Sequence, residues 1–102
     1  GAGIAYLCGG GYEEVIHTVV NALAIVSGMV CDGAKASCAA KIASSVDAGI
    51  LGYNMYLRGQ QFYAGDGIVT KGVEATIQNI GRLGKDGMKE TNEEIIKMMI
   101  SD

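Results

Sequence analysis

The chain has 102 residues, of which 49% are hydrophobic and 19% charged, with a net charge of -3 and a pI near 5. A chain of this length forms one domain at most, and its apolar content excludes an intrinsically disordered segment. Its acidic balance argues against a nucleic-acid surface, so no DNA or RNA partner is expected.

The chain contains no proline, and its 16 glycines stand beside many alanines in apolar stretches. Small side chains let helix backbones approach closely, although each interior glycine costs about 1 kcal/mol of helix propensity relative to alanine. Packing between helices must offset that cost. The composition therefore predicts an all-α fold with closely packed helices.

Compartment and membrane association are judged from the cysteines and the hydrophobic runs. Three cysteines at uneven spacing do not form the disulfide framework of a small secreted protein, which favours a reducing cytoplasm. Polar residues interrupt the most hydrophobic segment before it reaches the length of a membrane span, at His17, Thr18, Asn21 and Ser27. No membrane partner is expected.

The first two predicted helices flank a triple glycine. Residues 1–9 are small and apolar, and we expect their helix to end at residues 9–11. In residues 12–29 apolar side chains recur on two adjacent helical rows that wrap most of the circumference, which predicts a central helix. Glu13 and Glu14 lie in its first turn, where negative charge complements the helix dipole.

The apolar pattern stops at residues 31–33 and resumes in residues 34–57, which predicts a second long helix. Periodicity is lost again in residues 58–66, a predicted loop anchored by Phe62 and Tyr63.

The C-terminal third predicts two further helices. The first spans about residues 70–83, and the glycine-rich residues 81–90 predict a turn after it. Thr91 followed by Glu94 is a capping-box pattern, which predicts that a short last helix begins with Thr91 as its N-cap. The expected architecture is an all-α bundle of about four helices.

The string GMVCDGAKASCAAKI contains the residues best suited to metal binding or catalysis. Cys31 is expected in the turn before the second long helix and Cys38 about one turn inside it, so that both sulfurs reach one metal cluster. The spacing alone is weak support, because cysteines in apolar helical regions more often pack in a core. Both roles stay open from the residues alone.

Nearby polar residues also have a common structural role and a rarer functional one. Asp32 is either a helix N-cap or a functional acid. Lys35 and Lys41 are either solvated or hold a substrate carboxylate. His17, the single histidine, is expected to be a hydrogen-bonded packing residue rather than a general base. The catalytic residue therefore stays unassigned.

Several strings resemble one known family. CDGAKASCAAKI, preceded by SGM, resembles the signature of the serine dehydratase alpha-chain-like family, which includes iron–sulfur L-serine dehydratase alpha chains and L-cysteine desulfidases. Three further blocks match in the same order: GIAYLCGGGYEEV, GDGIVTKGVEATIQNIGRLGKDGM and TNEEIIKMM. Because members are several times longer, the resemblance implies that residues 1–102 are a single C-terminal segment whose N-terminal part is missing.

The resemblance also implies a cofactor and a reaction. Family members bind a [4Fe-4S] cluster through three cysteines, and an open iron acts as a Lewis acid in β-elimination. L-cysteine would yield pyruvate, ammonia and sulfide, and L-serine would yield pyruvate and ammonia. Cys31 and Cys38 match ligand positions, and Asp32, Gly33 and Lys35 are the positions expected to contact the amino-acid substrate.

The resemblance places the remaining ligand upstream of Gly1, and Cys8 falls where the family usually has an apolar residue. The chain by itself is therefore expected to be metal-free and inactive, although its parent would carry the cluster. Two alternatives remain: a protein of the same fold without lyase activity, and a helical oligomerisation module that forms homo-oligomers.

Overall fold

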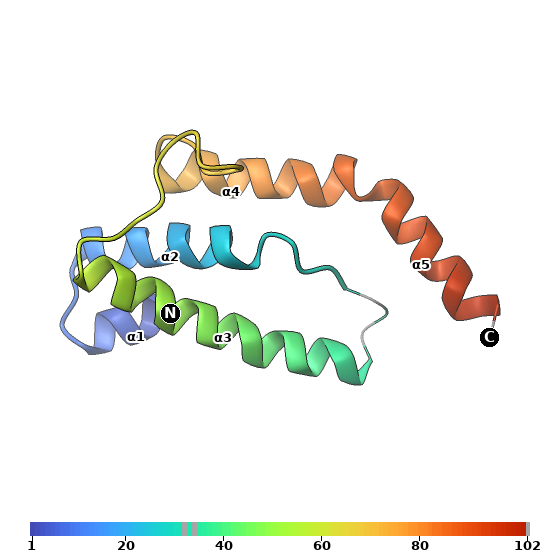
Figure 1. Cartoon of the computed structure of the whole chain (residues 1–102), viewed down its shortest axis with the longest axis horizontal. Helices are drawn as coiled ribbons and strands as arrows, with labels where there is room; N and C mark the ends of the chain where they lie inside the picture. Colours follow the sequence, from blue (N-terminus) through green and yellow to red (C-terminus); the bar gives the residue numbers. More distant parts are fainter. Residues whose placement is uncertain (32, 34, 102) are drawn as a thin grey trace.

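The computed structural model describes residues 1–31, 33 and 35–101, and these form helices joined by loops (Figure 1). A π-helical turn, η1, joins the last two α-helices. The described residues contain no strand, so the predicted all-α class is confirmed. The elements in order are α1 (Ala2–Leu7), α2 (Tyr12–Val26), α3 (Ala36–Leu57), α4 (Val73–Arg82), η1 (Leu83–Gly87) and α5 (Lys89–Ser101).

The two long helices predicted from apolar periodicity are present with slightly different ends. α2 begins at Tyr12 as expected and ends at Val26, three residues early. α3 begins at Ala36 and ends at Leu57, the predicted last residue. The first-turn Glu14 accepts a hydrogen bond from the Gly11 backbone N–H at 2.8 Å, which fixes the start of α2.

The turn predicted over residues 81–90 is confined to Met88. Helical structure continues through η1 to Gly87 and resumes in α5 at Lys89, so Thr91 lies inside a helix and is not its N-cap. None of the glycines in this stretch has a positive φ, and the absence of proline leaves nothing that forces the helix to break. Glycine spacing alone therefore gave the wrong prediction for this segment.

The helices form a flat arrangement around α2. α3 packs along one side of α2 and α4 along another, while α1 turns back and contacts both α2 and α3 (Figure 1). Among the described helices, α5 packs only against η1. The Cα atoms extend over 49 × 27 × 16 Å, so the thin dimension is less than two helix diameters, each of about 10 Å.

The core of the described residues is small. Its buried apolar residues are Ala5, Val20, Ala48 and Val69, whereas the largest fully buried side chains are polar: Asn21, Thr18 and Thr76. Many large apolar side chains on α1, α3 and α5 are exposed instead. The hydrophobic composition therefore does not produce a correspondingly large core within this segment.

Asn21 joins three parts of the fold. Its Nδ2 donates a hydrogen bond to the carbonyl of Gly52 in α3 at 3.0 Å, and its Oδ1 accepts one from the Phe62 N–H at 3.2 Å. Gly52 is buried where the helices meet, and a Cβ there would lie only 3.2 Å from the Thr18 carbonyl oxygen. A glycine at residue 52 thus allows the close α2–α3 approach that the composition predicts.

The loop after α3 is held mainly through its backbone. Phe62 is half-buried and bonded to Asn21, in agreement with the predicted anchor. The Tyr63 side chain is 61% exposed, so it is not an anchor, although its N–H donates to Asp66 at 2.7 Å. Within the described part of the chain, no helix combines the length and the apolar character that a membrane crossing requires.

Candidate metal centre at the start of α3

Two sulfur atoms come together where the chain enters α3. Cys31 lies in the connection before the helix, and Cys38 lies in its first turn, where its N–H donates to the Lys35 carbonyl at 2.9 Å. The Sγ atoms of Cys31 and Cys38 are 3.6 Å apart, within hydrogen-bonding range for thiols. The seven-residue separation across a turn thus places both sulfurs at one point.

The sulfurs line a shallow hollow of about 250 Å³. Lys41 belongs to its wall, and its Nζ donates a hydrogen bond to the Val30 carbonyl at 2.7 Å, which ties α3 to the connection that follows α2. Met29 and Ile42 add exposed apolar surface to the rim. The site therefore combines two thiols, an ammonium group and apolar side chains that remain open to solvent.

Two of the expected substrate-contact residues, Gly33 and Lys35, do not form the wall of this hollow. Asp32 lies outside the described residues. Lys35 is exposed and serves as the N-cap of α3 through its backbone. Gly33 has a φ of +121°, and a Cβ there would lie 2.6 Å from Sδ of Met99. The lysine on the wall is Lys41, which the sequence suggested only as an alternative.

Cys8 lies at the other end of the molecule. It is the C-cap of α1 and neighbours Tyr53: desolvation raises the pKa of the Tyr53 phenol, and the Cys8 thiol and Glu14 raise it further. Tyr53 is 15 residues beyond Cys38 in α3 (53 minus 38), or about 22 Å along the helix axis. The first helix does fold back onto α2 and α3, yet it does not bring Cys8 to the thiol pair.

Two thiols at this distance suit few kinds of chemistry. As thiolates they can share one soft metal ion, because two sulfurs at about 2.3 Å from a tetrahedral ion lie about 3.8 Å apart. They can also contribute part of a larger cluster's ligand set, or join as a disulfide. Among the described residues, no three histidine, cysteine or acidic side chains converge as a metal site. As metal ligands, these two thiols would supply only part of a ligand set.

The pair gives a direct test of the geometry. Mild oxidation with diamide should form a Cys31–Cys38 disulfide, because the sulfurs need to move only about 1.6 Å closer to reach bonding distance of about 2.0 Å. Peptide mapping should show this bond, with Cys8 still available for alkylation. Mixed disulfides that involve Cys8 as often as Cys38 would contradict the placement.

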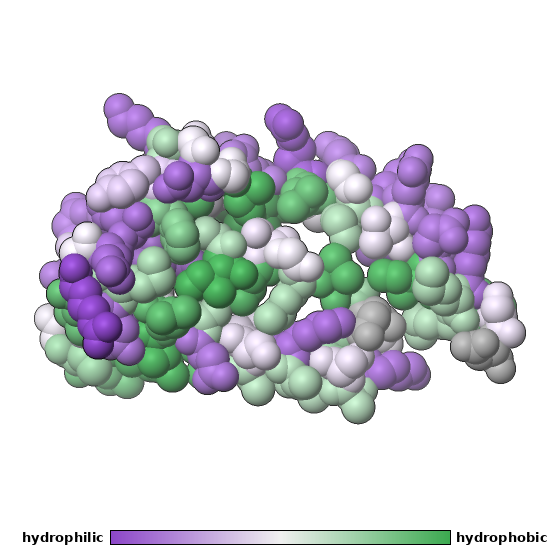
Figure 2. All heavy atoms as spheres, viewed as in Figure 1, coloured by the Kyte–Doolittle hydropathy of each residue, from purple (hydrophilic) through white to green (hydrophobic). Residues whose placement is uncertain are grey.

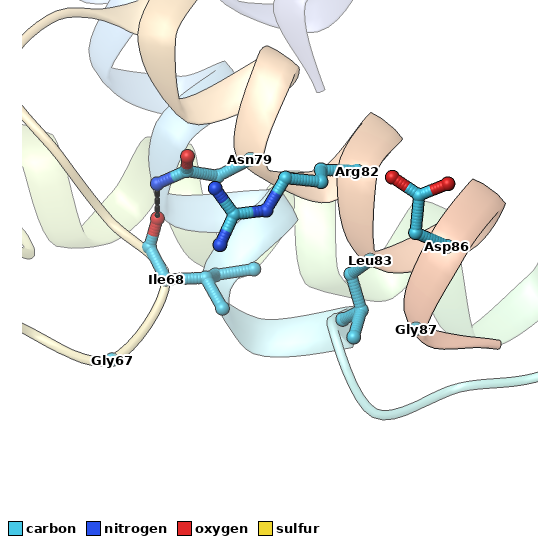
Figure 3. Close-up of a pocket in the computed structure, with 7 residues that line it drawn as sticks. All are labelled: Gly67, Ile68, Asn79, Arg82, Leu83, Asp86 and Gly87. Carbon is cyan, nitrogen blue, oxygen red and sulfur yellow. Dashed lines mark hydrogen bonds between the residues drawn. The ribbon is translucent and has the colours of Figure 1, made fainter.

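Two other hollows lie away from the thiols. The larger, about 570 Å³, is formed by α4, η1 and the loop at Gly67 and Ile68 (Figure 3). The Arg82 side chain extends toward Ile68, while the Asp86 carboxylate lies on the following turn, and Asn79 Nδ2 donates to the Ile68 carbonyl at 3.1 Å. This hollow contains no sulfur ligand, and sequence reasoning did not anticipate it.

His17 lines the second of these hollows, which has a volume of about 200 Å³. Its Nε2 lies 3.2 Å from Glu13 Oε2, and its ring stacks on Tyr56 with the ring centroids 5.0 Å apart. The predicted role as a hydrogen-bonded packing residue agrees with this arrangement.

Comparison with known sequences assigns the family. Residues 1–97 match the sequence family described as serine dehydratase alpha chain. The chain belongs to this family. A UPF0597 protein of Desulfitobacterium hafniense is 72% identical over 99% of the chain, and one of Lachnoclostridium phytofermentans is 54% identical over 99%. No solved structure matches the chain.

The chain spans about a quarter of the length of these curated relatives, 24% in both cases. The relatives are thus about four times longer, which agrees with the expectation that this chain is one part of a larger protein. Their names state no activity, so substrate and reaction belong to the proposal that follows.

Proposed function

We propose that this chain is the cluster-binding segment of an iron–sulfur-dependent lyase that performs β-elimination on a small amino acid, L-cysteine or L-serine. The observation that carries the proposal is the pair of thiols 3.6 Å apart on an open hollow, in a member of the serine dehydratase alpha-chain family. A cytoplasmic location is part of the proposal, because exposed thiols persist in a reducing compartment.

The type of donor atom in the hollow, thiol sulfur, suits an iron–sulfur cluster. Thiolates are the usual cluster ligands, and both cysteines are at least partly exposed and line the hollow. The number of donors is too small, because a three-cysteine set needs one more thiolate than this hollow contains. We assign the third ligand to the part of the longer protein outside this chain.

The bound cluster would supply a Lewis acid for the leaving hydroxyl or thiol of the substrate. This chain would contribute Cys31 and Cys38 as ligands, and the Lys41 ammonium would place positive charge beside the thiolates and the substrate carboxylate. Gly33 and Lys35 border the same connection, and with Asp32 they remain proposed substrate contacts. The base that removes the α proton is assigned to the longer protein.

The two alternative functions predict different chemistry. A family member without lyase activity would retain the fold and the thiol pair but form no product. A helical oligomerisation module would use the exposed apolar residues of α3 and α5 to pair copies of the chain, without any need for a metal.

A full-length chimera tests the proposal. It consists of the Desulfitobacterium hafniense relative with its matched quarter replaced by this chain, hereafter the full-length chimera. Purified without oxygen, it should contain about four irons and four acid-labile sulfides per chain, and it should release pyruvate from L-cysteine or L-serine. A chimera that binds the cluster but releases no pyruvate would support the inactive alternative. A chimera that lacks both the cluster and pyruvate release would contradict the proposal.

The 102-residue chain alone provides the matched comparison. Reconstituted with iron and sulfide, it should take up less than a stoichiometric amount of cluster and release no pyruvate, because its hollow provides two thiolates. Stoichiometric uptake with turnover would show that all ligands lie within the chain.

A further inference from the structure

One face of α3 carries a row of exposed aliphatic side chains. Ile42, Val46 and Ile50 follow one another at intervals of four residues and are 68%, 50% and 39% exposed. Residues at this interval share one helix face. We call these three residues the α3 stripe.

Most of the α3 stripe lies away from the contacts that α3 makes within the chain. The buried Gly52 packs against α2, and the buried Ala48 shares its helix face, which lies roughly 140° around the helix axis from the stripe at 3.6 residues per turn. The contact of α3 with the first helix is nearer: Gly49, which meets Gly1, lies about 60° from the stripe. Along the lower edge of Figure 2, where α3 runs in Figure 1, pale residues alternate with hydrophilic ones. The three stripe residues remain 39% to 68% exposed, so no described element covers the stripe fully.

The stripe and the thiol hollow share a residue. Ile42 is the first member of the stripe and also lines the hollow that contains Cys31 and Cys38. Whatever packs along the stripe would therefore reach the rim of the hollow and limit the access of water to the sulfurs. Docking on this face and protection of the thiols are thus expected to occur together.

The length of the relatives identifies the occupant. About three quarters of each relative lies outside the stretch that this chain matches. A chain of 300 residues or more buries about 75% of its unfolded surface, whereas the described part of this chain buries only four apolar residues. A covalently connected segment also has a high effective concentration and would occupy the stripe before a second copy could.

We infer that the α3 stripe binds an apolar helix from the part of the longer protein that lies outside this chain. This helix closes the thiol hollow along the rim at Ile42. The small residues Ala39 and Ala43 flank Ile42 and give the incoming helix room for close packing. This interface does not depend on the chemistry under "Proposed function", because it needs neither cluster nor substrate.

Val46→Glu in the full-length chimera tests the interface, with Ser44→Glu as the matched control on the same helix. Val46 is half exposed within the segment itself, so contacts inside the chain predict little change. The interface predicts that Val46→Glu lowers the thermal midpoint by several degrees and speeds alkylation of Cys31 in the metal-free chimera several-fold. Ser44, exposed and off the stripe, should tolerate glutamate with neither change.

Val46→Ala extends the test if Val46→Glu does not fold. It should lower the midpoint less than glutamate does and raise Cys31 reactivity in the same direction. Val46→Glu that behaves like Ser44→Glu in both measurements would overturn the inference. A dimeric chimera that Val46→Glu converts into monomers of unchanged midpoint would also overturn it, because the occupant would then be a second copy.

Discussion

Cys31→Ser in the full-length chimera should abolish both iron incorporation and pyruvate release. Cys31 provides one of the two sulfurs at the hollow, and a serine hydroxyl is a poor ligand for the iron of a cluster. Iron and acid-labile sulfide per chain, measured after anaerobic purification, report on the cluster independently of activity. The thermal midpoint of the metal-free protein should change little, because serine keeps the shape of cysteine and can still hydrogen-bond to Cys38.

Cys8→Ser is the control for this substitution. Cys8 is also exposed, but it caps α1 beside Tyr53 at the far end of α3. The Cys8 variant should keep nearly full iron content and activity. Equal losses from the two substitutions would refute the assignment of Cys31, and loss of activity with full iron content would make Cys31 a substrate contact rather than a ligand.

The sequence predicted the long helices because their signal is local. The apolar rows of α2 and α3 recur at helical spacing whatever surrounds them, and Leu57 was correctly predicted as the last residue of α3. The convergence of Cys31 and Cys38 was predictable for the same reason, because a short connection followed by one helical turn restricts their separation.

Features that depend on tertiary packing were predicted less well. The glycines of residues 81–90 indicated a turn, but glycine permits a helix as well as a turn, and only the packed chain decides between them. The choice of Lys41 rather than Lys35 for the wall of the hollow depends on the 2.7 Å bond from Lys41 to the Val30 carbonyl across the connection. No periodic pattern reveals such a contact.

Burial was the least predictable property. Apolar periodicity identifies helix faces that need cover, and Val46 and Ile50 belong to the apolar pattern that predicts the second long helix. It does not identify whether the cover belongs to the same segment. The α3 stripe follows the apolar pattern, but it stays largely exposed because α1, α2 and α4 do not pack over it.

Asn21 was likewise noted only as an interruption of a hydrophobic run, although it is fully buried and bonded on both sides of its amide. Asn21→Leu in the full-length chimera should reduce the free energy of unfolding by roughly 2–4 kcal/mol. The substitution keeps the volume approximately but leaves the Gly52 carbonyl and the Phe62 N–H without their partner, and each such buried group costs about 1–3 kcal/mol. Urea unfolding of the wild-type and variant proteins measures the difference.

Asn54→Leu is the matched control, because Asn54 is exposed on α3 and the same exchange there removes no buried hydrogen bond. Its effect should stay within about 0.5 kcal/mol, as is usual for surface substitutions. The Asn21 variant should also show faster hydrogen exchange in α2, α3 and the loop at Phe62, since one amide joins all three. A similar loss in the free energy of unfolding for both variants would contradict this role of Asn21. The α2–α3 contact would then be held by the close approach at Gly52.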